Sequence, residues 1–127
     1  TQAVLPAMRA RQWGRIVNIS SGAARGAGAI GVHYNASKAG MEGLTRGYAA
    51  RLVKEGITVN AVAPSLIETD MMRSVKPEVL QKIVSTVPVG RLGKPSEIAS
   101  IVAFLASDAA SLMTGSIVLA DGGYSCW

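Results

Sequence analysis

The sequence has too few cysteines and histidines to build a metal centre or a disulfide-stabilised fold. Its single cysteine, Cys126, excludes an intrachain disulfide and a thiolate metal cluster. Its single histidine, His33, has no His or Cys partner at ligand spacing. We therefore predict no metal site, and the lack of disulfides favours a reducing, cytoplasmic compartment.

Long hydrophobic runs are also missing. The most apolar stretch, residues 98–106, is interrupted by Ser100 and falls far short of the ~20 residues that cross a bilayer. The first ten residues lack the apolar core of a secretion signal and have helical spacing, with Val4, Leu5 and Met8 on one face. We predict no membrane span, and because the chain begins without methionine we expect it to start inside a helix.

Basic side chains outnumber acidic ones by 13 to 8, which gives a formal net charge of +5. Four arginines lie early in the chain, at Arg9, Arg11, Arg15 and Arg25. This charge favours anionic partners, such as the phosphates of a dinucleotide or an acidic protein. The arginines do not form the dense, aromatic-interleaved run that is typical of nucleic-acid binding, so we predict no nucleic-acid partner.

The arrangement of apolar residues predicts an α/β fold in one domain, residues 1–127. Short β-branched runs at 15–20, 57–63 and 116–120 are bounded by Gly, Pro or Asp-Gly-Gly and read as interior strands. Helical spacing follows at about 34–55, ended by Gly56, then at 77–87 and from Pro95. The apolar faces of the first and last of these helices are Met41, Leu44, Tyr48 and Leu52, and Ile98, Ile101, Val102 and Leu105. Strands that alternate with helices predict about three parallel strands covered by helices.

Glycines raise two further questions. Gly40, Gly43 and Gly47 form a stripe on the long helix, where each glycine costs roughly 1 kcal/mol relative to alanine. They are either tolerated weak helix formers or the contact of a tight helix crossing or subunit interface. The segment from Gly26 to Gly31 matches G-x-G-x-x-G, but five residues separate it from the preceding strand and no acidic residue ends a following strand. We interpret it as a flexible active-site loop rather than a phosphate cradle.

Three residues form a candidate proton-transfer unit. Tyr34 and Lys38 are four residues apart at the start of the long helix, so both side chains project from one face. An ammonium about 4 Å away stabilises a phenolate by roughly 4 kcal/mol at an effective dielectric of about 20, which favours proton exchange with an alcohol or carbonyl oxygen. Ser21, at the end of the first strand, could donate a hydrogen bond to that oxygen. Spacing alone leaves an ordinary helix pair as the alternative.

The neighbouring motifs resemble the classical short-chain dehydrogenase/reductase family over essentially the whole chain. They are Gly14-Arg-Ile-Val-Asn-Ile-Ser-Ser21, the 13-residue step to Tyr34-Asn-Ala-Ser-Lys38, Gly56-Ile-Thr-Val-Asn-Ala-Val-Ala-Pro64, and Thr114-Gly-Ser-Ile-Val-Leu-Ala-Asp-Gly-Gly123. Within this family, the motifs most resemble those of the 3-oxoacyl-acyl-carrier-protein reductases of fatty acid biosynthesis. The resemblance implies the C-terminal half of a doubly wound Rossmann-type parallel sheet, with the cofactor-binding N-terminal half absent.

By this resemblance, Ser21 positions the substrate carbonyl, Tyr34 donates the proton, and Lys38 lowers the pKa of Tyr34. The resemblance also implies NADP or NAD as cofactor. Tyr34, Lys38, Pro64, Ile67 and Thr69 would contact it, and residues of about 66–90 would form a mobile substrate lid. Ser65 follows Pro64 where the family commonly has glycine, which would restrict the approach of the backbone to the nicotinamide.

The resemblance implies an oxidoreductase that interconverts a carbonyl and a secondary alcohol, as a homodimer or homotetramer. Acyl carrier protein is an expected partner, with Arg9 and Arg11 as its contacts, although Glu55 lies where the family often has a basic residue. Two alternatives stay open: a family member that acts on a sugar, steroid or other small alcohol, and an inactive fragment that serves only as an assembly module. We expect these 127 residues to be inactive alone and to self-associate through an exposed sheet edge.

Overall fold

The chain folds around a three-stranded parallel sheet in a computed structural model that describes residues 1–26 and 30–125. Strands β1 (Gly14–Ile19), β2 (Ile57–Pro64) and β3 (Ile117–Ala120) lie in the order β1-β2-β3. Gly14 of β1 stands opposite Ile57, and Ala61 of β2 stands opposite Ile117. The predicted fold class and all three predicted strands are therefore confirmed.

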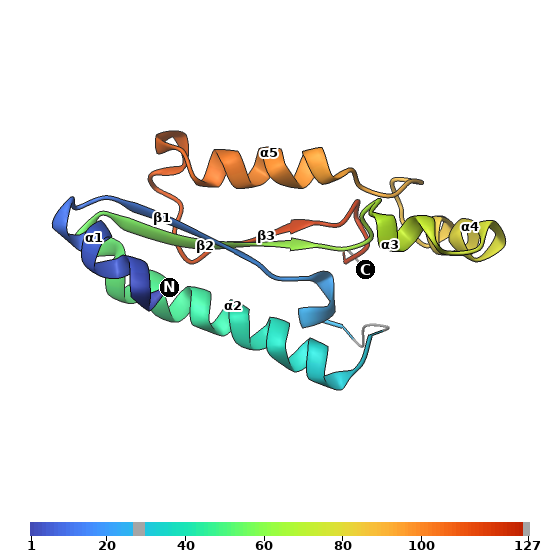
Figure 1. Ribbon diagram of the computed structural model, residues 1–127, viewed down its shortest axis with the longest axis horizontal. Helices are drawn as coiled ribbons and strands as arrows, with labels where there is room; N and C mark the ends of the chain where they lie inside the picture. Colours follow the sequence, from blue (N-terminus) through green and yellow to red (C-terminus); the bar gives the residue numbers. More distant parts are fainter. Residues whose placement is uncertain (27–29, 126–127) are drawn as a thin grey trace.

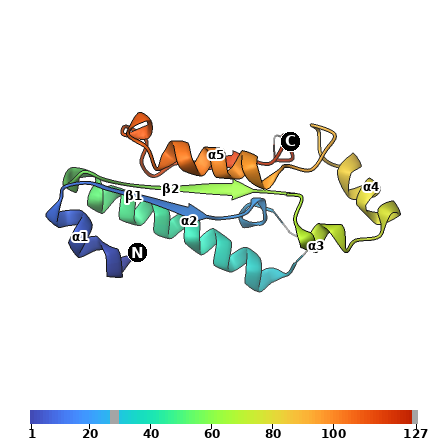
Figure 2. The ribbon, with the colours of Figure 1, turned by 45° about the horizontal axis from the view of Figure 1, so that its top comes forward.

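Helices cover both faces of this sheet (Figure 1). The helices are α1 (Leu5–Ala10), α2 (Val32–Leu52), α3 (Asp70–Arg73), α4 (Pro77–Ser85) and α5 (Pro95–Leu105), with short 3-10 turns at Gln2–Val4, Gly22–Ala24, Val53–Glu55 and Asp108–Ala110. Figure 2 shows α2 on one side of the strands, α5 on the other, and α3 and α4 beyond the end of the sheet. The short α3 is the one helix that the apolar pattern did not predict.

Strand β2 is the centre of the core. It is buried from Ile57 to Ala63, and its side chains alternate between two apolar clusters. The cluster under α2 contains Leu5, Ala49, Leu52, Ile57 and Val59, and the cluster under α5 contains Val62, Leu105 and Ala110. All four predicted apolar residues of α5 belong to the second cluster, so its predicted face is confirmed.

Within the described residues β2 alone has a strand on both sides, so the prediction of three interior strands is confirmed for β2 and stays a prediction for β1 and β3. Both are edges of the described sheet, and Ile19 on β1 is 43% exposed. A β-branched run predicts a strand, but it carries no information about how many neighbours that strand has.

The predicted apolar face of α2 is also wrong in part. Leu52 is buried, but Leu44 is 46% exposed. The buried residues of this helix are Glu42, Thr45, Ala49 and Leu52. Two of them are polar, and each has a hydrogen-bond partner that makes its burial possible. Thr45 accepts from Asn18 of β1, and Glu42 accepts from Ser20, directly after β1. In the opening helix, Leu5 is buried and Met8 packs on the core as predicted, whereas Val4 is exposed.

A clamp that the sequence did not predict fastens the start of β1 to the turn after α5. Trp13 Nε1 and Arg15 Nη2 each donate to Asp108 Oδ1 at 3.0 Å. The guanidinium carbon of Arg15 lies 4.9 Å from the Trp13 ring centroid, and that of Arg11 lies 5.3 Å away. The indole therefore lies close to two cations and donates to the carboxylate that pairs with one of them, Arg15.

The glycines of the long helix have different surroundings from the glycine that ends it. A Cβ at Gly40 or Gly43 would meet no atom within 4 Å in the described part of the chain. No other helix of the described residues packs on Gly40 or Gly43, so these residues provide no tight helix crossing there. A subunit interface and a tolerated weak helix former both stay open as interpretations. Gly56 has φ +71, and a Cβ there would collide with the Gln12 carbonyl.

Alanine at two of these glycines should have opposite effects on stability. Gly56→Ala forces a side chain into the left-handed region against backbone and should lower the free energy of unfolding by about 1–2 kcal/mol or more. Gly40→Ala adds a good helix former in open space and should raise it by about 0.5–1 kcal/mol. Urea denaturation of both variants measures the difference. A loss of stability in both would contradict the open surroundings of Gly40.

Candidate functional site

The carboxyl ends of the three parallel strands lie at one edge of the sheet. Ser21, Pro64 and Asp121 lie at or just beyond the ends of β1, β2 and β3. The amide of Ser65 donates to the Ala120 carbonyl at 3.4 Å. A Cβ built on Gly22 would lie 3.7 Å from Ser65 Cβ. The edge at which ligands bind in open parallel sheets is thus formed by all three strands.

Ser21 caps the short 3-10 turn Gly22–Ala24. Its Oγ accepts a hydrogen bond from the Ala23 amide at 3.2 Å. Because the hydroxyl accepts this bond, its own hydrogen remains to donate to another oxygen. The half-buried hydroxyl is therefore held in place and can still act as a donor.

Tyr34 and Lys38 lie on the first turns of α2, and both are half-buried. Lys38 Nζ donates to the Ile19 carbonyl at 2.7 Å and lies 5.6 Å from the Tyr34 ring centroid. The ammonium therefore sits between the tyrosine ring and the end of β1, two residues before Ser21. This contact joins the strand that carries Ser21 to the helix that carries the other two predicted residues.

A row of polar contacts continues along the same interface between β1 and α2. Asn18 Nδ2 donates to Thr45 Oγ1 at 2.9 Å. Ser20 Oγ lies 3.3 Å from both the Lys38 carbonyl and Glu42 Oε1. The contact between Ser20 and Glu42 was not predicted from the sequence. The available signal was the alternation of Asn18 and Ser20, which places two polar side chains on one face of a strand.

The three predicted cofactor contacts after β2 follow one another along the chain. Pro64 ends β2, Ile67 forms an isolated parallel bridge with Gly93, and Thr69 precedes α3. The Thr69 side chain makes no capping hydrogen bond to α3. Their placement beyond β2 agrees with the predicted segment, and their contact with a cofactor stays a prediction.

A cavity of about 330 Å³ lies on the α5 side of this edge, away from Tyr34 and Lys38. It is lined by residues 66–67, 119–123, the start of α5 and the returning segment that includes Val87, Val89 and Gly93. Of the predicted site residues, only Ile67 lines it. The Val89 amide donates to the Gly122 carbonyl at 3.1 Å, which fastens the end of the predicted lid to the turn after β3.

Two carboxylates near this cavity have lowered pKa values. Hydrogen bonds from Arg91 lower the pKa of Glu97 to about 2, and its Oε2 also accepts from the Lys94 amide at 2.7 Å. Burial acts to raise the pKa of Asp121, but hydrogen bonds from Ser125 and Gly123 together hold it below its usual value. Glu97 thus holds the main chain at the start of α5, and Asp121 holds the main chain of the turn after β3.

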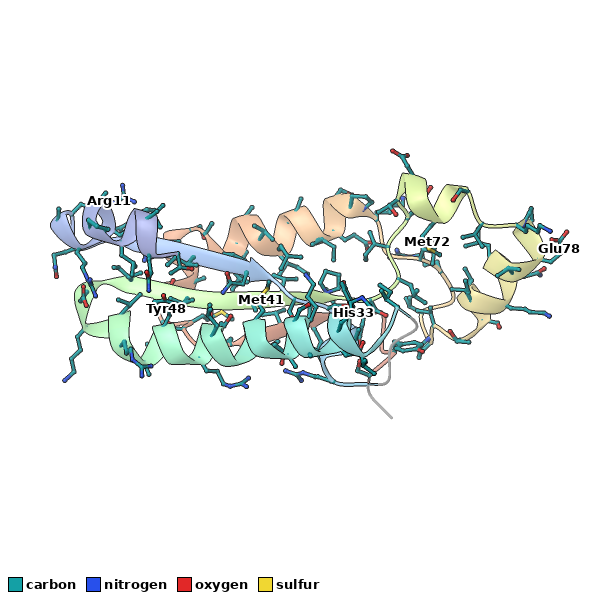
Figure 3. All side chains as sticks on the ribbon, turned by 60° about the horizontal axis from the view of Figure 1, so that its bottom comes forward. Arg11, His33, Met41, Tyr48, Met72 and Glu78 are labelled. Atoms are coloured by element: carbon teal, nitrogen blue, oxygen red, sulfur yellow. The ribbon has the colours of Figure 1, made fainter. Side chains whose placement is uncertain are left out.

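The remaining predicted features lie elsewhere. Arg11 is at the far end of the molecule from His33, at the start of α2 (Figure 3). Arg9, in α1 beside Arg11, is ion-paired with Glu55. Residues 27–29 of the G-x-G-x-x-G segment lie outside the described residues, so its interpretation as a loop stays untested. Asn35 Nδ2 donates to the Gly26 carbonyl at 2.8 Å.

Residues 1–26 and 30–125 contain neither a membrane-spanning helix nor a cluster of metal ligands. No helix there is long and apolar enough to cross a membrane. No three side chains of His, Cys, Asp or Glu come together there as a metal site would require.

Comparison with known proteins covers nearly the whole chain. A family model described as enoyl-(acyl carrier protein) reductase matches residues 1–125. Nodulation protein G of Azospirillum brasilense is 46% identical over 97% of this chain and 50% of its own length. A 3-oxoacyl-[acyl-carrier-protein] reductase of Pseudomonas aeruginosa is 45% identical over the same shares. An acetoacetyl-CoA reductase of Shinella zoogloeoides is 48% identical over 97% of this chain and 52% of its length. The chain spans about half the length of the curated relatives it matches.

Solved structures give the same result. A 3-oxoacyl-[acyl-carrier protein] reductase from Brucella melitensis is 40% identical, with a TM-score of 0.93 over 97% of this chain and 47% of that one. A structure from Agrobacterium tumefaciens with bound NADP is 35% identical, with a TM-score of 0.92 over 99% of this chain and 52% of that one. Sequence and backbone thus agree over the same residues.

The lowered pKa of Glu97 makes part of the stability sensitive to acid. Its pKa is about 2 in the folded chain and near 4.5 when unpaired, so its contribution is present above pH 4.5 and is lost as the pH falls toward 2. Glu97→Gln should flatten the fall in melting temperature over this window, and Arg91→Gln should have the same effect. Because the pair is exposed, the difference should be small and should shrink in high salt. An unaltered acid profile in both variants would contradict the assignment.

Proposed function

Because the chain belongs to the short-chain dehydrogenase/reductase family, we propose that it is the catalytic half of an oxidoreductase that uses NADP or NAD. The reaction interconverts a carbonyl and a secondary alcohol. The observation that carries this proposal is the placement of Lys38 Nζ against both the Tyr34 ring and the end of β1, beside Ser21.

The three side chains divide the work of proton transfer. Ser21 Oγ, which accepts from the Ala23 amide, donates its own hydrogen to the substrate oxygen. Tyr34 gives its phenolic proton to that oxygen, and Lys38 holds a positive charge beside the phenolate that forms. A bound nicotinamide would supply the hydride for the carbonyl carbon. The oxygen and carbon together gain one proton and one hydride, which makes the alcohol.

The chemistry of the donor set fits the ribose of a nicotinamide cofactor. An ammonium has three hydrogens, and Lys38 uses one on the Ile19 carbonyl. Two remain for hydroxyl oxygens of a sugar. Pro64, Ile67 and Thr69 would contact the nicotinamide end along the segment that leaves β2. The Agrobacterium relative with bound NADP supports this cofactor class.

A β-keto acyl thioester is the substrate class that the relatives favour. Two of the similar proteins are reductases of 3-oxoacyl-carrier-protein and acetoacetyl-CoA. Residues 66–90 would close over such a substrate, with α3 and α4 beyond the end of the sheet (Figure 1). Arg11 lies far from His33 at the start of α2 (Figure 3), and Arg9 lies in α1 just before Arg11, so an acidic carrier protein at the site would have to contact other basic residues.

An inactive assembly module is the second candidate. Its support is apolar surface: Ile19 on the edge strand β1 is 43% exposed, and Leu112, after α5, is 97% exposed. Such surface favours self-association into a dimer or tetramer. Turnover separates the two candidates, since only the first requires Tyr34.

Replacement of Tyr34 should abolish turnover in the longer enzyme that carries this chain. Tyr34→Phe removes the proton donor and keeps the ring, so kcat for a β-keto ester should fall by about 10²–10⁴-fold. Tyr48→Phe is the matched control and should keep full activity. Tyr48 lies on the same helix but packs against the apolar cluster under α2, which contains Leu5. NADPH oxidation measures both variants. Normal turnover by Tyr34→Phe would contradict the assigned role.

These 127 residues assayed alone should show neither saturable cofactor binding nor turnover. They span only about half of the relatives, so they can supply only part of a cofactor site. Titration with NADPH and NADH, followed by fluorescence, tests this expectation after the intact mass is checked. Saturable binding with turnover that Tyr34→Phe abolishes would show that a partner, such as a second copy, completes the site.

A further inference from the structure

Glu42 is a buried carboxylate that the proton-transfer scheme does not use. It is 5% exposed and lies on α2 one helical turn after Lys38. A buried carboxylate is unfavourable unless hydrogen bonds and an opposite charge compensate it. Its partners are Ser20, whose Oγ lies 3.3 Å from Oε1, and Arg25, whose Nε lies 3.4 Å from Oε2.

These contacts connect three segments that carry the proposed catalytic residues. Ser20 directly precedes Ser21 at the end of β1, and Arg25 follows Ser21 by four residues in the loop after β1. Glu42 itself follows Lys38 by four residues on α2. The Glu42 carboxylate therefore connects α2 to Ser20, which precedes Ser21, and to Arg25, which follows it.

The chemistry of the contacts favours a charged acceptor at this position. Ser20 Oγ has one hydrogen, and it lies 3.3 Å from both the Lys38 carbonyl and Glu42 Oε1. A charged acceptor makes the stronger hydrogen bond and draws that hydrogen toward the helix side chain. The Arg25 side chain is 43% exposed, so its charge stays hydrated while its Nε reaches the buried oxygen.

We propose that Glu42 is a positioning residue that fixes the turn carrying Ser21 against the helix carrying Lys38, through Ser20 and Arg25. The inference rests on the proposed function for its consequence in catalysis. Glu42 does not touch the substrate. Its loss frees the loop after β1, and the Ser21 hydroxyl then no longer keeps one distance from Lys38.

Hydrogen exchange at the turn tests this inference without any need for turnover. The reporters are the amides of Ala23 and Ala24, which donate to Ser21 Oγ and to the Ser21 carbonyl. In Glu42→Gln and in Arg25→Gln, exchange at both amides should rise about tenfold or more, while the β2 amides of Val59 and Ala61 stay within about twofold. Arg25→Lys keeps the charge and should restore most of the protection.

Glu55→Gln is the matched control, because it makes the same chemical change in the pair that Glu55 forms with Arg9 at the other end of the molecule. It should leave Ala23 and Ala24 unaltered. Unchanged exchange at the turn in both Glu42→Gln and Arg25→Gln would overturn the proposal. An equal rise throughout β2 would also overturn it, since it would indicate a general stabilising role.

Kinetics in the longer enzyme separate this inference from the proposed function. Glu42→Gln should lower kcat more than it raises KM, because it misplaces the reacting groups and leaves the binding surface intact. If Glu42→Gln loses protection at the turn but neither the wild-type enzyme nor any variant shows turnover, the proposed function is overturned. The structural role of the Glu42 contacts with Ser20 and Arg25 then still holds. Normal protection and normal kcat in Glu42→Gln would overturn the positioning role alone.

Discussion

The register of α2 along β1 is the constraint on which the rest of the molecule depends. Three contacts set it: Asn18 with Thr45, Ser20 with Glu42, and the Ile19 carbonyl with Lys38. They occur at successive positions of the strand and at successive turns of the helix, so a slip by one residue would break all of them. The distance between the end of β1 and the side chains of the first turns of α2 is thereby fixed.

This interface changes character along its length. Toward its C-terminal end, α2 packs through Ala49 and Leu52 on Ile57 and Val59 of the neighbouring strand β2, and the contact is apolar. Toward the end of β1 it becomes polar, through Thr45 and Glu42. Apolar packing supplies stability without direction, whereas hydrogen bonds require defined geometry. The half that stabilises the fold and the half that could perform chemistry are thus parts of one helix that packs on two neighbouring strands.

Local patterns in the sequence predicted the strands and α5, because their apolar period and their Gly or Pro boundaries lie within a few residues of each other. They failed where the deciding partner is distant in sequence. The burial of Thr45 and Glu42 depends on residues 27 and 22 positions away, which no helical period can reveal. The short helix α3, Asp70–Arg73, has too few residues to show a period. Motif spacing pointed to Ser21, Tyr34 and Lys38 as site residues, and their roles stay predictions. The contact between Ser20 and Glu42 could not be predicted, because the two residues are 22 positions apart and only Ser20 belongs to a quoted motif.

The Trp13 clamp has a consequence for the order in which the chain can fold. Asp108 lies 95 positions after Trp13. Gly14 of β1 pairs with Ile57 of β2, which lies 43 positions later. Within this chain, β1 and α2 are therefore synthesised before β2, the strand on which both of them pack. Contacts of such separation close slowly. The clamp forms only after residue 108 has been synthesised, so a chain that ends before that residue leaves Trp13 and Arg15 without their shared carboxylate.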